Sequence, residues 1–377
     1  MINFKDKEWQ KRAIVPGAAL GVFVCIFLIG LIDFGTVTYS REDARDEENK
    51  EQTAAEATEE ALPTWPALLD TAAYDERMLA LAQYKSSSTT KLKYSSTTNV
   101  RIEGKAWPTN AVYPHGGAIL PFKRILAFYG NLYSTRMGIL GELPPDQVLA
   151  KLEATKKIWE TADPTTPVMT AIHYIAIVAQ AEGGRDGMYR AVMPETEIEK
   201  AYAMAKQSNS IFIIDLQVGK STIQDELPKF RKYLEQPDVH LAIDPEFSMK
   251  TGDKPGDVVG TYDAADVNYV INYLDQIIKE KQLPPKVFVI HRFTQNMLTR
   301  SSLIVPSENV QVIIDMDGWG PAANKIGTYN HFVAPDPVQF TGIKLFYKND
   351  LKPPSTGLLT PSQVLGLTPI PIYIQYQ

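Results

Sequence analysis

Two short acidic motifs are the residues of this chain whose spacing points most directly to chemistry. Asp244 and Glu246 flank one proline, and Asp315 and Asp317 flank one methionine, each pair at the end of an apolar run. Alternate residues of a strand point the same way, so the carboxyl groups of a pair face one side, about 6–7 Å apart. Hydrolysis of a glycosidic bond requires two opposed carboxyl groups, one protonated as the acid and one ionised as nucleophile or base. We predict Glu246 and Asp317 as this catalytic pair, with Asp244 orienting or tuning one of them.

Further polar and aromatic side chains follow similar apolar runs and are candidates for binding a sugar. Lys344 carries a positive charge that would keep a neighbouring carboxylate ionised. Trp319 stands between two glycines, which would leave its flat ring open for stacking on a sugar face. The predicted substrate-binding residues are Asp215, Gln217, His291, Trp319, Lys344, Tyr347, Gln375 and Tyr129.

Two other interpretations of the same residues remain open. A carbohydrate- or envelope-binding barrel without catalysis would keep the aromatic side chains and need no pair of differently tuned acids. A metal-dependent hydrolase would use His173, His291 and Asp215, with the other carboxylates, to hold a divalent ion. The chain has no HxH, HExxH or CxxC spacing, so we expect neither a metal nor a cofactor. It also has no GxSxG motif and no Walker loop, which argues against an α/β-hydrolase and a nucleotide hydrolase.

Eight apolar runs rich in Val, Ile and Phe would position these residues. Their near-continuous apolarity is typical of strands covered on both faces, as in a parallel sheet. Helical patterns with good start signals lie between several of them, at residues 144–162, 194–207, 263–281 and 360–367. The runs are residues 124–130, 168–176, 211–219, 239–247, 286–293, 310–318, 342–347 and 370–376.

This alternation of strands and helices predicts an α/β fold of the (β/α)8 TIM-barrel type. A doubly wound open sheet is the alternative, but no GxGxxG motif follows the first run and eight strands favour closure. The carboxyl ends of the strands form the active-site face of such a barrel. We therefore expect the polar residues named above to gather at one mouth.

An uncharged segment precedes the predicted barrel. Residues 13–32 are 20 residues without a formal charge, and a helix of that length spans about 30 Å of hydrocarbon. Basic residues precede the segment and acidic residues follow it, which places the amino terminus in the cytoplasm and the barrel outside. A cleaved signal peptide is the alternative. The segment is longer than a signal core and no Ala-x-Ala site follows it, so we expect a retained single-pass anchor in the cell membrane.

The chain divides into four predicted parts. Residues 1–12 form a basic cytoplasmic tail and residues 13–32 the transmembrane anchor. Residues 33–110 form an acidic stalk, a short helix and a Ser/Thr-rich linker, and residues 111–377 form the barrel domain.

Overall composition narrows the possible partners. The formal net charge is -6, so no basic surplus exists to neutralise a phosphate backbone, and we expect no nucleic-acid partner. The single cysteine, Cys25, permits no internal disulfide and lies within the predicted anchor.

The carboxyl-terminal two thirds of the chain, residues 124–377, also resemble a known group of proteins. The likeness rests on DLQVG, DPEF, HRFT, DMDGWG, KLFY and the terminal IQYQ. Together these motifs resemble a family of uncharacterised secreted or membrane-attached bacterial cell-envelope proteins, and in architecture the barrel is similar to glycoside hydrolases. The resemblance implies an extracytoplasmic bacterial setting. We expect a membrane-tethered glycoside hydrolase-like protein whose partner is a cell-envelope, cell-wall or environmental polysaccharide.

Overall fold

The structure, a computed structural model, describes residues 65–83, 93–94, 100–101 and 112–377. The predicted tail, anchor and acidic stalk lie outside these residues, as does most of the predicted linker. Among the described residues, none of the helices combines the length and the apolar character that crossing a bilayer requires. The described part of the compact unit that contains the barrel runs from Pro66 to Gln377.

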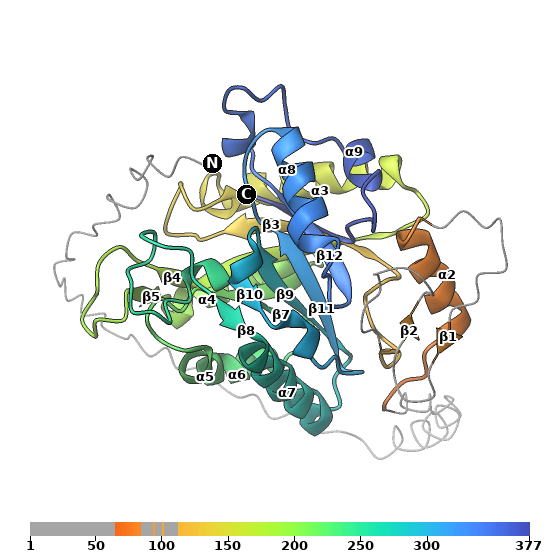
Figure 1. The fold of residues 1–377 in the computed structure, drawn as a ribbon, viewed down its shortest axis with the longest axis horizontal. Coiled ribbons are helices and arrows are strands. Elements are labelled where there is room, and N and C mark those ends of the chain that lie inside the picture. The colour runs from red at the N-terminus through yellow and green to blue at the C-terminus, as the bar shows by residue number, and fades with distance from the viewer. Residues whose placement is uncertain (1–64, 84–92, 95–99, 102–111) are drawn as a thin grey trace, which may run out of the picture. The chain divides into compact units, whose positions relative to one another are not determined.

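A closed barrel of eight parallel strands forms the centre of this unit (Figure 1). Its strands follow one another around the barrel in the order β3-β4-β6-β7-β9-β11-β12-β13, and β13 pairs with β3 to close the ring. The predicted (β/α)8 barrel is thus confirmed, and the open sheet was the wrong alternative. The strands are β3 (Arg124–Gly130), β4 (Val168–Ala179), β6 (Ile211–Leu216), β7 (Val239–Ile243), β9 (Lys286–Arg292), β11 (Val310–Met316), β12 (Phe340–Leu345) and β13 (Tyr373–Tyr376).

Helices follow most of the barrel strands. The four predicted helices are present as α3 (Pro145–Ala162), α4 (Glu195–Gln207), α7 (Ala264–Lys281) and α9 (Pro361–Leu365). Capping boxes begin α7 and α9, in which Asp263 and Thr360 accept hydrogen bonds from the first turn and so satisfy its free N–H groups. Further helical segments cover the connections after β6 and β11: α5 (Ile223–Glu226), η3 (Leu227–Phe230), α6 (Arg231–Leu234), α8 (Ala322–Thr328) and the π-helical η7 (Tyr329–Val333).

Short elements complete the described structure. Strand β5 (Arg190–Val192) pairs antiparallel with the end of β4, and β8 (Tyr262–Asp263) pairs with β10 (Leu298–Thr299). Within the predicted linker, β1 (Lys93–Tyr94) pairs antiparallel with β2 (Val100–Arg101), so part of that segment is structured. The remaining turns are 3₁₀ helices: η2 (Ile139–Gly141), η4 (Pro245–Phe247), η5 (Gln295–Met297), η6 (Ser301–Leu303) and η8 (Asn349–Leu351).

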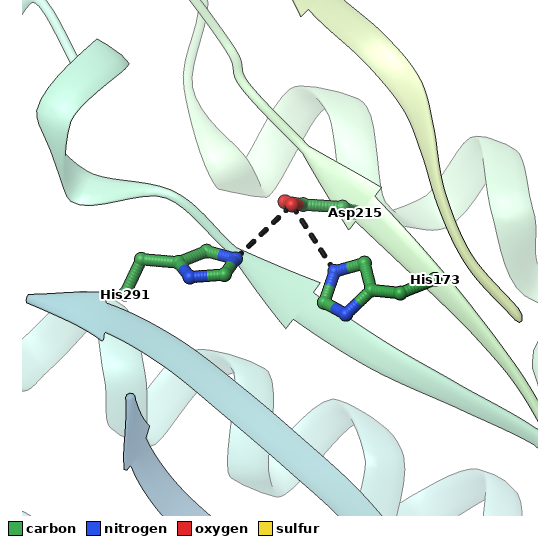
Figure 2. A group of neighbouring side chains, drawn as sticks. All are labelled: His173, Asp215 and His291. Atoms are coloured by element: carbon green, nitrogen blue, oxygen red, sulfur yellow. Dashed lines mark hydrogen bonds and ion pairs between the residues drawn. The ribbon is translucent and has the colours of Figure 1, made fainter. Parts of the chain in front are cut away.

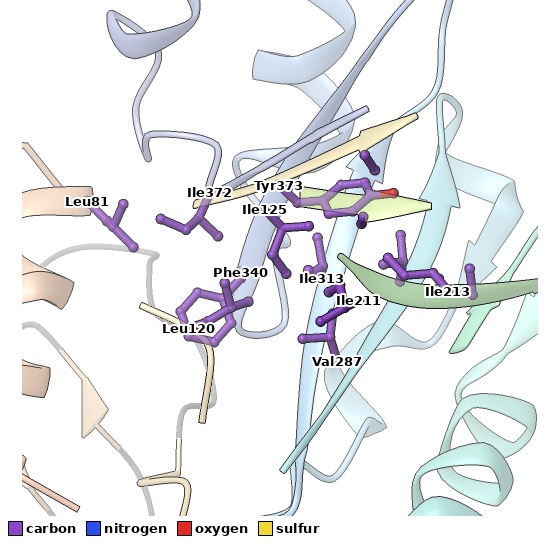
Figure 3. Packing of buried hydrophobic residues seen from close by; sticks show 14 of the residues in the cluster. Leu81, Leu120, Ile125, Ile211, Ile213, Val287, Ile313, Phe340, Ile372 and Tyr373 are labelled. Carbon is purple, nitrogen blue, oxygen red and sulfur yellow. The ribbon is translucent and has the colours of Figure 1, made fainter. Parts of the chain in front are cut away.

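Helix α2 (Thr71–Leu81) packs against the amino-terminal end of the barrel. Asp70 caps the helix by accepting a hydrogen bond from Ala73. Figure 3 shows Leu81 among barrel residues of the same apolar cluster, which also contains the buried Tyr74 and Met78 of α2. Burial of apolar area on both sides of this contact stabilises the packing at roughly 25 cal/mol per Å². The short helix predicted before the linker therefore belongs to the barrel's own core.

Candidate functional site

The barrel interior changes from apolar to polar along every strand. Ile213, Val289 and Ile313 belong to the apolar cluster, and the residue two positions later on each strand points to the same side. We call these later residues the polar layer. Each barrel strand contributes one side chain, either from its last residues or from the residue that follows it, and each side chain is at most 2% exposed. The polar layer consists of Tyr129, His173, Asp215, Asp244, His291, Asp315, Lys344 and Gln375.

Two histidines converge on one carboxylate at the centre of the polar layer (Figure 2). The Nε2 atoms of His173 and His291 each lie 3.2 Å from the Oδ2 atom of Asp215. The Nδ1 atom of each ring also has a side-chain partner. Nδ1 of His173 lies 2.6 Å from the hydroxyl of Tyr373, and Nδ1 of His291 lies 3.2 Å from Oδ2 of Asp315.

Burial and the contacts among these three groups shift their pKa values in different directions. Burial lowers the pKa of His173 to about 4, so this imidazole is neutral at pH 7. Burial opposes a charge on His291 as well, but the charge and hydrogen bonds of Asp215, together with Asp315, outweigh it and raise the pKa of His291 well above its ordinary value. Burial alone would raise the pKa of Asp215, yet the two facing imidazoles hold it well below its usual range. Asp215 is therefore a carboxylate at neutral pH.

Asp317 lies one step nearer the mouth and is ion-paired. The ammonium of Lys344 lies 3.1 Å from Oδ1 and 3.3 Å from Oδ2 of this carboxylate. The same ammonium lies 3.7 Å from the centre of the Tyr129 ring, so the face of an aromatic ring holds it in place. The predicted contact of Lys344 with a neighbouring carboxylate is present in the geometry.

Glu246 and Asp244 occupy a different environment. Asp244 caps η4 by accepting a hydrogen bond from the backbone N–H of Glu246 at 3.0 Å, and the Gln217 amide lies 3.4 Å from its other oxygen. Glu246 itself is half-buried in η4, because β7 ends at Ile243, so the predicted alternation of Asp244 and Glu246 along one strand was wrong. Burial, reinforced by the negative charge of Asp317, raises the pKa of Asp244 to about 7. Burial, followed by the charges of Asp244 and Asp317, raises the pKa of Glu246 well above its usual range.

A buried ion pair fixes the loop that carries Asp317 and Trp319. Lys325 lies 3.1 Å from Asp350, and its ammonium also donates to the carbonyl of Gly318 at 2.6 Å. The Asp350 carboxylate accepts the N–H of Gly320 at 2.9 Å. Trp319, between these two anchored glycines, is 54% exposed, as its setting in the sequence predicts.

The structure gathers most of the predicted site residues and places one elsewhere. Gln375 is buried beneath the mouth, where its amide nitrogen lies 2.9 Å from Nδ1 of His173. Tyr347 lies away from the polar layer: its ring stacks on Tyr376 at 5.1 Å, with the Lys151 ammonium of α3 3.7 Å above it. Tyr373, whose hydroxyl lies 2.6 Å from Nδ1 of His173, was not among the predicted site residues. Its position two residues before Gln375 on the same strand, with side chains on the same side, could have indicated it.

Gly342 of β12 makes room for two residues that contact the histidines. A Cβ atom at this position would lie 2.6 Å from Oδ1 of Asp315 and 2.8 Å from Cδ1 of Tyr373. We expect Gly342→Ala to lower the free energy of unfolding by about 1–3 kcal/mol, because both side chains must shift. Urea unfolding measures this loss. In the matched control Gly327→Ala, nothing lies within 4 Å of the new Cβ on helix α8, so stability should rise by about 0.5–1 kcal/mol.

One group in the polar layer has the composition of a metal site. One ligand atom each from His173, Asp215 and His291 lies within 4.8 Å of the others, and all three side chains are fully buried. Two imidazoles and a carboxylate are a donor set used for zinc and for other divalent transition metals. Oδ2 of Asp317 also lies near this group, 3.5 Å from Nδ1 of His291.

No protein-family model and no curated protein sequence matches the chain. Solved structures similar to it include a ruminal GH26 endo-beta-1,4-mannanase, with a TM-score of 0.32 and 9% identity over 67% of this chain and 58% of that one. They also include a mannanase of Bacillus subtilis, with a TM-score of 0.35 and 11% identity over 67% of this chain and 78% of that one. The chain thus spans less than two thirds of the first of these structures. At these scores the similarity supports no statement about activity.

Proposed function

We propose that this protein is a glycoside hydrolase that cleaves polysaccharide through Glu246 and Asp317. The observation that carries the proposal is the contrast between the two carboxyl groups at the mouth of one barrel. Glu246 is half-buried with a raised pKa, whereas Asp317 is ion-paired with Lys344. A protonated Glu246 and a neighbouring Asp317 that faces a lysine ammonium suit the two roles that glycoside hydrolysis needs.

In this mechanism Glu246 donates its proton to the oxygen of the scissile glycosidic bond. Asp317 acts from the other side, as nucleophile towards the sugar or as base towards a water molecule. Lys344 forms an ion pair with Asp317, and its cation–π contact with Tyr129 limits the positions that its ammonium can take. Burial, followed by the charges of Asp244 and Asp317, raises the pKa of Glu246 and so favours its protonated form.

Trp319 supplies a surface for the sugar chain in this proposal. Its ring is more than half exposed, two residues after Asp317, on a loop held by the Lys325–Asp350 ion pair. The Lys352 ammonium lies 5.2 Å from the centre of this ring. The exposed part of the indole offers apolar contact to the C–H face of a pyranose.

The proposed setting is outside the cytoplasm, at the cell membrane. Residues 13–32 are the proposed anchor, and the acidic residues that follow them agree with a barrel outside the cytoplasm. The substrate proposed for this location is a cell-envelope or environmental polysaccharide. A barrel of the same kind that only binds sugar would not need the contrast between Glu246 and Asp317.

A screen for polysaccharide release tests both the reaction and the tether. The full-length chain should be recovered from the membrane fraction, extracted in detergent and incubated with cell-wall glycans and plant and microbial polysaccharides, mannan included. We expect soluble oligosaccharides from wild type and none from Asp317→Asn. The exposed substitution Glu76→Gln on α2 should release as much as wild type. Equal release by wild type and Asp317→Asn would remove the proposed reaction, and recovery in the soluble fraction would remove the tether.

A further inference from the structure

We propose that His173, Asp215 and His291 bind one divalent transition-metal ion, with zinc the best match, deeper in the barrel than Glu246 and Asp317. The three ligands come from β4, β6 and β9, and all are fully buried. The site adjoins the catalytic pair, since Nδ1 of His291 lies 3.5 Å from Oδ2 of Asp317, but metal binding there does not require the proposed reaction.

The first argument is the spacing of the ligand atoms. Both nitrogen-to-oxygen distances to Asp215 are 3.2 Å, at the long end of the range for a hydrogen bond, about 2.7–3.2 Å. Zinc bonds of about 2.0–2.1 Å at tetrahedral angles set neighbouring ligand atoms roughly 3.3 Å apart. Both distances to Asp215 match this spacing, and the three ligand atoms lie within 4.8 Å of one another.

The second argument is that side-chain contacts at Nδ1 hold both rings in place. Metal-ligating histidines are usually fixed by a contact at the ring nitrogen that does not bind the metal. Nδ1 of His291 lies 3.2 Å from the Asp315 carboxylate. Nδ1 of His173 lies 2.6 Å from the hydroxyl of Tyr373 and 2.9 Å from the amide nitrogen of Gln375. Both Nε2 atoms are thereby turned inward, towards Asp215, as Figure 2 shows.

The third argument concerns an unpaired atom. Oδ1 of Asp215 is buried and has no hydrogen-bond partner, which is costly for a carboxylate. A divalent ion beside Asp215 would supply the missing partner.

The site differs from the expectation of no metal drawn from the sequence. His173 and His291 lie 42 and 76 residues from Asp215, on separate strands, so no short sequence motif contains the three ligands. Three protein ligands leave the fourth position of a tetrahedral ion for water or for an oxygen of a bound molecule, which is typical of catalytic rather than structural zinc.

Metal binding can be measured without any substrate. The full-length chain in detergent, stripped with a chelator and dialysed, should bind one equivalent of Zn²⁺ in calorimetry. Co²⁺ in its place should give the visible absorption bands of a four-coordinate ion, and these bands should disappear when one equivalent of Zn²⁺ is added. A wild-type chain that binds no stoichiometric Zn²⁺ and gives no such bands would overturn the proposal.

Variants locate the ion within the barrel. His291→Ala should abolish the Co²⁺ bands, and the milder Asp315→Asn should keep one site but weaken its affinity about 10–100-fold. The control His331→Gln, at an exposed histidine, should bind as wild type does. Because His291→Ala removes a buried side chain, circular dichroism must show that it is folded, and Asp315→Asn gives the answer if it is not. Unchanged affinity in folded Asp315→Asn would contradict the assignment, whatever the outcome of the polysaccharide screen.

Discussion

The variant Glu246→Gln is expected to cleave the substrate polysaccharide about 10²–10⁴ times more slowly than wild type, because it cannot donate a proton to the leaving oxygen. The raised pKa of Glu246 keeps this carboxyl group protonated at neutral pH, so wild type is expected to be active there. Wild-type kcat/KM should therefore fall as the pH rises through that pKa, and this fall should be absent in the variant. Rates measured across the pH range with the polysaccharide found in the screen test both statements.

Leaving groups of different basicity separate an acid from a residue that only shapes the site. An aryl glycoside with an acidic phenol needs little protonation, so its cleavage by Glu246→Gln should be reduced far less than cleavage of the polysaccharide. The control Glu76→Gln, on the exposed face of α2, should match wild type on both substrates. Equal losses on both substrates would show that Glu246 does not act as the general acid.

The second large effect is a dependence of stability on pH that originates at Asp244. Burial raises the pKa of this carboxyl from 3.8 to about 7 in the folded chain. The stability that it contributes is thus fully present below the ordinary pKa and is lost as the pH rises through about 7. At about 1.36 kcal/mol per pH unit, the loss amounts to roughly 4 kcal/mol. Asp244→Asn cannot ionise and should not show it.

Urea unfolding of wild type and Asp244→Asn from pH 4 to pH 8, in the presence of a chelator, measures this effect. The difference in free energy of unfolding should move in favour of the variant by roughly 4 kcal/mol across that range. Asp146→Asn, on the exposed first turn of α3, should differ from wild type by a constant amount. A constant difference for Asp244→Asn as well would mean that Asp244 ionises in the folded chain as it does in the unfolded chain.

The barrel was predictable because its signals are local. Each strand is a near-continuous apolar run, and helices such as α7 begin with capping residues that are visible in the sequence. The segments after β6 and β11 were not predicted, since their helices are short or π-helical and carry little periodicity. The packing of α2 into the barrel core was also missed, because the contact joins Met78 to residues far along the chain.

The candidate site was predictable only in part. The acidic motifs around Asp244 and Asp315 could be found in the sequence, because each places two acids on either side of one residue at the end of an apolar run. Tyr347 shares that position in the sequence, yet it lies beyond the end of β12, where its ring stacks on Tyr376 instead of entering the barrel. The convergence of His173 and His291 on Asp215 depends on how three strands are staggered, which no single segment encodes.

The packing of helix α2 decides which end of the barrel a substrate can use. Tyr74 and Met78 are buried in the apolar cluster at the amino-terminal end, so packed side chains close that end of the barrel. In the proposed reaction, the sugar and the cleaved fragments must therefore enter and leave at the carboxyl-terminal end. Accumulating fragments should then slow turnover by competing for the entrance, and a polymer cannot be threaded through from end to end.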